Sequence, residues 1–390
     1  MLQPTLDFQP FRPTFSDEQL AQLQLALAAS RLPKPTYASR QEKYGTTHSW
    51  MVEALERWKN GFDWREYEKK LYTVDHYMTS IEDEGDEYKI HFIYHNSADP
   101  EAIPLVLLHG WPGSAFEFID VVKLLRESTA PSFHLIVPFE PGYGWSSPPP
   151  LSRDTYELKD CVRLIDELAV GLGYGDGYAV AGGDIGSGLA RMLAVEKEAC
   201  KAILVNFLPA VKPPDGNAMV LVKPHELENM KRGEEVMKTG LAYAWEQGQR
   251  PSTLGIVVDS SPIATLAWLG EKYEEWTCDS LPLDEILAIA TLYYLHESMG
   301  TSIWAYPEML TNSIANIHTS PEWYLHKPFG FSAFAGAKKD WAPAPEAWAA
   351  KTGEMGFYRY HAKGGHFPGL ECPEQYAQDL RDCFAKIWPS

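Results

Sequence analysis

The 390-residue chain has no excess of positive charge. It carries 53 Asp and Glu residues against 34 Lys and Arg, which gives a formal net charge of −19. Nucleic acids and anionic membranes both bind basic protein surfaces, so this charge argues against either as a partner. A small neutral substrate is easier to reconcile with it.

Cysteine pairs, long apolar runs and internal repeats are also missing. The five cysteines show no C-x-x-C spacing, which indicates free thiols in a reducing compartment. No apolar run approaches the ~20 residues of a membrane span, and the N-terminus lacks a basic segment followed by an apolar one. No metal-ligand spacing or phosphate-cradling loop occurs, so we expect neither a metal nor a cofactor. With 45% apolar residues, the chain predicts a globular, cytoplasmic protein.

The order of apolar segments after residue 103 predicts a mostly parallel sheet flanked by helices. Short apolar strands alternate there with longer helices, as in α/β proteins. We expect strands at 105–108, 133–137, 178–182, 202–207, 329–335 and 357–361. We expect helices at 116–127, 155–172, 186–196 and 373–387.

Four parts are predicted along the chain. Residues 1–96 form an N-terminal meander that begins with a capped helix at Ser16 and ends with a hairpin. Residues 97–207 and 328–390 supply the two parts of the core. Residues 208–327 are mostly helical in pattern and rich in aromatics, and an insertion there would cover the carboxyl ends of the strands. We therefore predict a helical lid.

One turn in this pattern carries a candidate nucleophile. Asp184 stands between the strand at 178–182 and the helix at 186–196, in the sequence Gly-Gly-Asp-Ile-Gly. A tight strand-to-helix turn requires small residues two positions either side of its apex, where Gly182 and Gly186 stand. α/β-hydrolases hold their nucleophile on such a turn, usually as serine. The pattern predicts Asp184 as the nucleophile of an α/β-hydrolase fold.

The backbone around this turn predicts an oxyanion hole. One N–H comes from the residue after the nucleophile, here Ile185, and the other comes from the loop after an early strand. That loop reads His-Gly-Trp-Pro-Gly at 109–113, and Trp111 is its natural donor.

A histidine and a carboxylate complete the candidate triad. His366, in the Gly-Gly-His-Phe sequence at 364–367, follows the last expected strand and could reach the nucleophile turn. Asp340 follows the preceding strand and would orient the imidazole, with Asp215 as the alternate acid. The chain order of Asp184, Asp340 and His366 is the nucleophile, acid, histidine order of the α/β-hydrolases.

An aspartate nucleophile restricts the chemistry. Attack of a carboxylate on a saturated carbon leaves an ester that histidine-activated water can hydrolyse, whereas serine would leave a stable ether. The displaced group is then an epoxide oxygen or a halide. An epoxide oxygen needs a proton or a strong hydrogen bond, which a tyrosine hydroxyl can supply, and the lid segment is rich in tyrosine.

In combination, the motifs at 109–113, 182–186 and 364–367 resemble those of the soluble fungal and bacterial relatives of the microsomal-type epoxide hydrolases. The opening section is similar to that family's N-terminal meander, for example in Phe-Asp-Trp-Arg at 62–65. The resemblance covers nearly the whole chain. It implies an α/β-hydrolase that converts epoxides to vicinal diols without a cofactor, with a small-molecule epoxide and water as its only expected partners.

The resemblance also implies which lid tyrosines act on the epoxide oxygen. Tyr243 and Tyr306 match the family's pair, whereas Tyr273 and Tyr293 are expected to be core aromatics. Membrane-bound members carry an N-terminal anchor that has no match here, so membrane attachment is not implied.

Two other functions stay open. A haloalkane or haloacid dehalogenase shares the fold and the aspartate, and it would release halide without depending on Tyr243 or Tyr306. A non-catalytic binding protein would retain its ligand without turnover. A serine esterase is disfavoured because Ser187 lies three residues past the turn apex. The sequence leaves open the substrate's size, the preferred enantiomer and a homodimer formed through the N-terminal meander.

Overall fold

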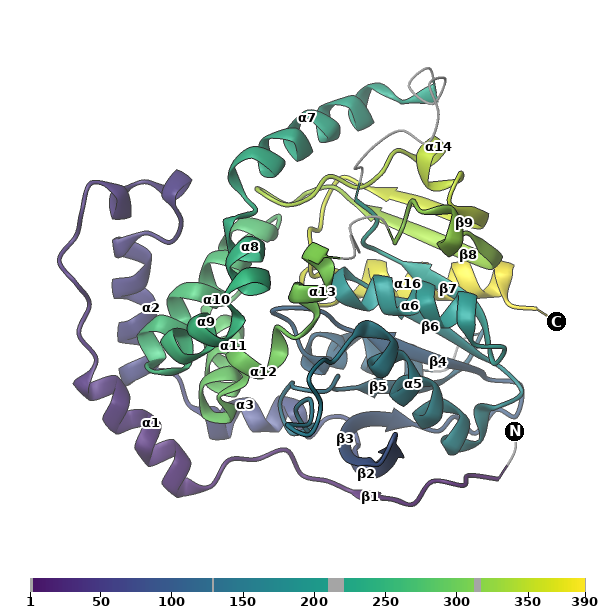
Figure 1. The fold of residues 1–390 in the computed structure, drawn as a ribbon, viewed down its shortest axis with the longest axis horizontal. Helices are drawn as coiled ribbons and strands as arrows, with labels where there is room; N and C mark the ends of the chain where they lie inside the picture. Colours follow the sequence, from purple (N-terminus) through teal and green to yellow (C-terminus); the bar gives the residue numbers. More distant parts are fainter. Residues whose placement is uncertain (1–2, 128–129, 210–220, 312–316, 390) are drawn as a thin grey trace.

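The computed structural model describes residues 3–127, 130–209, 221–311 and 317–389 (Figure 1). These residues contain a nine-stranded sheet in the order β1-β2-β3-β5-β4-β6-β7-β8-β9. The strands are β1 (Phe8–Pro10), β2 (His76–Asp83), β3 (Asp86–His95), β4 (Ile103–Leu108), β5 (Phe133–Pro138), β6 (Tyr178–Gly182), β7 (Cys200–Val205), β8 (Leu325–Phe334) and β9 (Gly353–His361). The first three strands pair antiparallel, and the remaining six pair parallel with one another. The predicted, mostly parallel sheet is confirmed.

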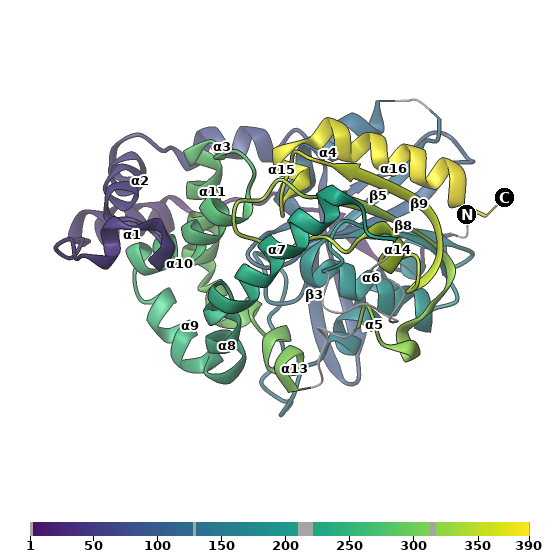
Figure 2. The ribbon, with the colours of Figure 1, turned by 90° about the horizontal axis from the view of Figure 1, so that it is seen from above.

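Helices cover both faces of this sheet. α4 (Ile119–Arg126) and α16 (Pro373–Ile387) lie along one face, and α5 (Leu158–Ala169) and α6 (Asp184–Glu196) lie along the other (Figure 2). The strands from β4 to β7 are almost entirely buried between these layers. Burial on both faces explains why these strands read as continuous apolar runs in the sequence.

The six predicted core strands all form, but some boundaries were wrong. β8 begins at Leu325 and β9 at Gly353, four residues earlier than expected in each case. The start of β8 carries Lys327 and Pro328, and the pairing with β9 is irregular there, so its strand character is hidden in the sequence. The predicted helix at 155–172 begins later, at Leu158, and a π-helix (Val170–Tyr174) continues from the end of α5 at Ala169.

The N-terminal section contains a helix cap and a hairpin turn that could be predicted from the sequence. Its helices are α1 (Asp17–Ala29), α2 (His48–Asn60) and α3 (Trp64–Leu71). The predicted cap of α1 forms, since the Ser16 side chain accepts from the Gln19 backbone and the Gln19 side chain accepts from the Ser16 backbone. The β2–β3 hairpin turns at Glu84 and Gly85, whose φ angles of 52° and 92° suit a tight two-residue turn.

A group of helices separates β7 from β8 in the chain. They are α7 (Pro224–Thr239), α8 (Ala242–Gln249), α9 (Pro251–Asp259), α10 (Pro262–Trp276), α11 (Leu283–His296), α12 (Ser298–Ser302) and α13 (Ala305–Thr311). α1 and α2 lie beside α10 and α11 (Figure 1), where the Trp58 indole donates to the Thr291 hydroxyl at 3.0 Å. Within the described part of the chain no single helix is long and apolar enough to cross a membrane, whereas the bent pair α9 and α10 meets that test together.

Candidate active site

The turn from β6 into α6 holds Asp184 in a strained backbone conformation. Asp184 has a φ of +47°, in the left-handed region that residues other than glycine rarely adopt. At Gly186, a Cβ atom would lie 2.4 Å from the His109 carbonyl oxygen, so no larger residue fits there without a shift. The predicted need for small residues around the turn is therefore confirmed.

The loop after β4 presents a backbone donor to this aspartate. The Trp111 N–H donates to Oδ1 of Asp184 at 2.9 Å. This close approach requires glycine at position 110, where a Cβ atom would lie 2.5 Å from Oδ1 of Asp184. The Trp111–Pro112 peptide bond is cis. Ile185 is buried in the first turn of α6, where backbone N–H groups have no carbonyl partner within the helix.

The His109 side chain connects the same loop to the backbone of Glu140 through hydrogen bonds. Its Nε2 accepts from the Glu140 backbone N–H at 3.2 Å, so the proton is on Nδ1, which lies 3.2 Å from the Gly110 carbonyl oxygen. Burial lowers the pKa of His109 to about 4. The imidazole therefore stays neutral at pH 7 and keeps both hydrogen bonds.

The structure brings the three candidate triad residues together. Nδ1 of His366 lies 2.8 Å from Oδ2 of Asp340, and Nε2 lies 3.4 Å from Oδ2 of Asp184. All of these groups follow the carboxyl ends of parallel strands, with Asp340 after β8 and His366 after β9. Burial alone would lower the pKa of His366, but the carboxylates of Asp340 and Asp184 raise it well above its usual value. The alternate acid, Asp215, lies outside the described residues.

Two tyrosines face the same aspartate from the helices that follow β7. Tyr243 on α8 and Tyr306 on α13 are 9% and 2% exposed. The Tyr243 ring stacks on Trp111 with centroids 5.6 Å apart, and the Tyr306 ring meets Trp111 edge-on at 5.8 Å. Burial, followed by the charge of nearby groups including Asp184, raises the pKa of both hydroxyls well above the usual value, so both stay protonated.

Asp184 and both tyrosines line one cavity of about 310 Å³. The rest of its wall is mainly apolar and comes from the core and from the helices after β7: Leu158, Ile185, Gly188, Phe207, Pro209, Met237, Leu241, Ala244, Trp245, Met309, Leu310, Ile317, His318 and Trp341. A cavity of this kind, apolar with a few convergent polar groups, is typical of a small-molecule site.

Comparison with known proteins agrees with this arrangement. Residues 8–118 match the family described as "Epoxide hydrolase N terminus", and residues 103–211 match the "alpha/beta hydrolase fold" family. The epoxide hydrolase of Aspergillus niger is 41% identical, and its solved structure matches with a TM-score of 0.90 over 99% of this chain and 98% of that one. Epoxide hydrolase 1 of Sus scrofa is 28% identical, over 96% of this chain and 87% of its own length. The chain belongs to the epoxide hydrolase family.

Family membership and the α/β-hydrolase fold confirm the resemblance seen in the sequence motifs. The solved juvenile hormone epoxide hydrolase of the silkworm Bombyx mori, 24% identical, shares the fold with a TM-score of 0.87 over 98% of this chain. The similarity extends across the N-terminal meander, the core and the helices after β7.

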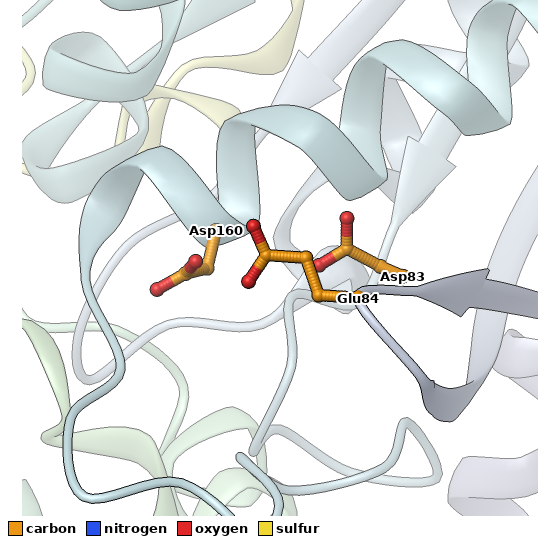
Figure 3. Close-up of side chains that lie close together, drawn as sticks. All are labelled: Asp83, Glu84 and Asp160. Atoms are coloured by element: carbon orange, nitrogen blue, oxygen red, sulfur yellow. The ribbon is translucent and has the colours of Figure 1, made fainter.

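An acidic cluster elsewhere in the molecule has the spacing of a metal site but is already neutralised. Asp83, Glu84 and Asp160 lie close together at the junction of the β2–β3 hairpin and α5 (Figure 3). Arg163 pairs with Asp83 at 2.8 Å and with Asp160 at 2.6 Å, and Arg153 also contacts both carboxylates. Two guanidinium groups balance most of the negative charge, so this cluster fastens the hairpin to the core.

Two buried acids near Asp184 were not predicted from the sequence. Burial, opposed by His366 and reinforced by Asp184, raises the pKa of Glu117 to about 8. Burial raises the pKa of Glu140 well above its usual value, and neither of its carboxyl oxygens has a hydrogen-bond partner among the described residues. Both groups are therefore protonated at neutral pH. The position of Glu140 directly after β5 is the one signal that could have pointed to it.

Proposed function

We propose that this protein opens epoxides to vicinal diols through a covalent ester on Asp184. The observation that carries the proposal is the surroundings of the Asp184 carboxylate. Oδ1 accepts from the Trp111 N–H, Oδ2 faces the imidazole of His366, and two buried tyrosines line the same apolar cavity. A group that attacks and two groups that protonate oxygen thus line one cavity, and the group that activates water lies against the attacking group.

In the first step, a carboxylate oxygen of Asp184 attacks one epoxide carbon and the carbon–oxygen bond on the far side breaks. The departing oxygen accepts a hydrogen bond from the hydroxyl of Tyr243 or Tyr306, and one of them transfers its proton. Because burial raises the pKa of both hydroxyls, both are protonated at neutral pH and can donate. The product of this step is an ester between Asp184 and the opened substrate.

In the second step, the esterified Asp184 no longer carries the charge that helps to raise the pKa of His366. Nε2 of His366 then takes a proton from water, and the water oxygen attacks Cγ of the ester. The Asp340 carboxylate orients the imidazole through Nδ1 and stabilises its positive charge. The N–H groups of Trp111 and Ile185 stabilise the oxyanion that forms. Collapse of this intermediate transfers the proton of His366 to the leaving oxygen and releases the diol. The acid proton left on Asp184 then returns to the tyrosinate, which restores the Asp184 carboxylate and the tyrosine hydroxyl.

The cavity indicates the class of substrate. Its wall offers mainly aliphatic and aromatic side chains, and the polar groups gather where the reaction would occur. A neutral epoxide with an apolar substituent fits this wall, in keeping with the net charge of −19.

A single turnover in ¹⁸O-labelled water tests the proposal. Excess enzyme is mixed with styrene oxide as a probe, and mass spectrometry follows both the diol and the peptide that contains Asp184. We expect unlabelled diol and label in Asp184, because water attacks the ester carbonyl and leaves its oxygen on the enzyme. Labelled diol with an unlabelled peptide would mean that water attacks the epoxide directly.

A halide-release assay distinguishes epoxide hydrolysis from dehalogenation, the rival reaction. A dehalogenase would release halide from a chloroalkane and would keep that activity in Tyr243→Phe and Tyr306→Phe. We expect no halide release above the rate of the enzyme-free control. A binding protein would retain the epoxide unchanged and give no diol.

A further inference from the structure

A buried arginine lies at the far end of a hydrogen-bond network that begins at the nucleophile turn. Arg191, on α6, is 1% exposed and has no carboxylate partner among the described residues. Burial lowers its pKa to about 9, so it remains a cation at neutral pH. Its Nη1 donates to the carbonyl oxygens of Trp323 at 2.9 Å and Thr352 at 3.0 Å. Burying an uncompensated charge is costly, so this arginine needs an explanation.

The arginine fixes the tautomer of a neighbouring histidine. Nε of Arg191 donates to Nδ1 of His318 at 3.2 Å. A guanidinium group can only donate, so Nδ1 of His318 carries no proton. Burial, together with the charge of Arg191, lowers the pKa of His318 well below its usual value, and the neutral ring therefore carries its single proton on Nε2.

The direction of the next two hydrogen bonds follows from this tautomer. Nε2 of His318 lies 3.2 Å from Oγ of Ser187 and donates to it. The Ser187 hydroxyl in turn donates to the carbonyl oxygen of Asp184 at 2.6 Å. A serine that bonds the carbonyl three residues back is common in helices and has no functional meaning by itself. Here two further groups fix its orientation, and the bond ends on the strained residue of the turn.

We propose that Arg191, His318 and Ser187 are positioning residues, which act as a one-way hydrogen-bond chain that holds the nucleophile in its reactive orientation. This inference rests on Asp184 being the nucleophile, as proposed above. These hydrogen bonds anchor the carbonyl group of Asp184, while the Asp184 side chain accepts a hydrogen bond from the Trp111 N–H. His318 also lines the cavity, so the chain links the wall of the cavity to the nucleophile turn.

Two substitutions of one residue separate the two ends of the chain. His318→Gln keeps a donor at the position of Nε2 and loses the acceptor at Nδ1, whereas His318→Asn does the reverse. If donation to Ser187 positions the nucleophile, His318→Asn and Ser187→Ala slow ester formation about 10- to 100-fold, and His318→Gln slows it clearly less than His318→Asn. Rapid-quench single turnovers at saturating epoxide measure this step apart from substrate binding.

A matched control removes an equally buried serine hydroxyl elsewhere. Ser332 donates to Asp379 at 2.6 Å in the core, and Asp379 keeps Arg359 and His361 as partners after substitution. Ser332→Ala should lower the melting temperature about as much as Ser187→Ala without slowing ester formation. If Ser187→Ala reacts as fast as the wild type, or if the two His318 variants react at the same rate, the chain has no positioning role.

A spectroscopic measurement tests the chain without relying on catalysis. In ¹⁵N-histidine-labelled protein at pH 7, the His318 signal, assigned by its loss in His318→Asn, should show a bare Nδ1 and a protonated Nε2. The opposite tautomer would overturn the inference even in an active enzyme. Absence of an Asp184 ester in the wild type would instead remove the proposed function and leave this hydrogen-bond geometry standing.

Discussion

The core and the helices after β7 contribute to the cavity in different ways. Asp184, Trp111, Asp340 and His366 all lie on short connections at the carboxyl ends of parallel strands. Tyr243 and Tyr306 come instead from α8 and α13, helices of eight and seven residues. Backbone geometry fixes the positions of the core groups, and aromatic packing fixes the positions of the two tyrosines. In the proposed mechanism, connections of the core therefore carry the covalent chemistry, while separate helices carry the groups that act on the leaving oxygen.

Trp111 is the point where the two regions meet. Its backbone N–H donates to Asp184, and its indole ring packs against both Tyr243 and Tyr306. Tyr273 and Tyr293, from α10 and α11, reach the same loop and donate to the carbonyl oxygens of Pro112 and Gly113. Packing against this loop gives the helices a fixed register on the core.

The largest effect expected is the loss of the covalent step in the core. Asp184→Ala should lower kcat by roughly 10⁴-fold, because no neighbouring group can replace the carboxylate as nucleophile. Steady-state diol formation measures this loss, and an unchanged circular dichroism spectrum shows that the variant folds. Activity within tenfold of the wild type would remove Asp184 from the mechanism.

The next largest effect should separate ester formation from ester hydrolysis, two steps that both depend on core residues. His366→Gln should still form the ester but hydrolyse it about 10³-fold more slowly, since the water loses its general base. Intact-protein mass spectrometry should then show one substrate added to each enzyme molecule. A variant that turns over slowly without accumulating the adduct would place His366 in ester formation as well.

A smaller effect is expected from the tyrosines, confined to the first step. Tyr243→Phe and Tyr306→Phe should each slow ester formation about 100-fold and leave ester hydrolysis unchanged. Tyr324→Phe is the control, because its hydroxyl contacts Glu354 away from the cavity. If the tyrosine variants slow ester hydrolysis as much as ester formation, the proposed separation of roles between the core and the helices is wrong.

The smallest effect concerns stability, where the two regions should behave alike. Burial lowers the pKa of His134 in β5 and of His296 at the end of α11 to about 4 each. Below pH 6.5 the unfolded chain binds protons that the folded chain does not, so each histidine reduces the free energy of unfolding as the pH falls from 6.5 to 4. The slope approaches 1.4 kcal/mol per pH unit and histidine.

Urea titrations between pH 6.5 and 4 test this prediction. His134→Gln and His296→Gln should each flatten the pH dependence of the free energy of unfolding. A variant that leaves the pH dependence unchanged would show that the pKa of its histidine is not lowered in the folded protein.

Much of the fold could be predicted because local patterns determine it. Apolar runs locate the buried strands from β4 to β7, and the Ser16–Gln19 pair locates the start of α1. The prediction failed at the start of β8, where Lys327 and Pro328 conceal a strand that neighbouring β9 stabilises. The catalytic roles of the site residues stay predictions until the variants are measured.

The sequence by itself determined the turn that holds Asp184. Gly182 and Gly186 flank Asp184 because β6 must pass directly into α6, and that requirement is local in the chain. The loop at 109–113 and the position of His366 after a strand also depend only on neighbouring residues in the chain. Short sequence motifs were therefore enough to predict them.

Only the tertiary structure decided which distant side chains surround that turn. Nothing local distinguishes Tyr243 from Tyr273, yet one lines the cavity and the other holds the Pro112 carbonyl. The hydrogen bonds that lead from Arg191 through His318 likewise join residues 127 positions apart. Such contacts depend on how helices pack against strands, which the order of residues encodes only through the whole fold.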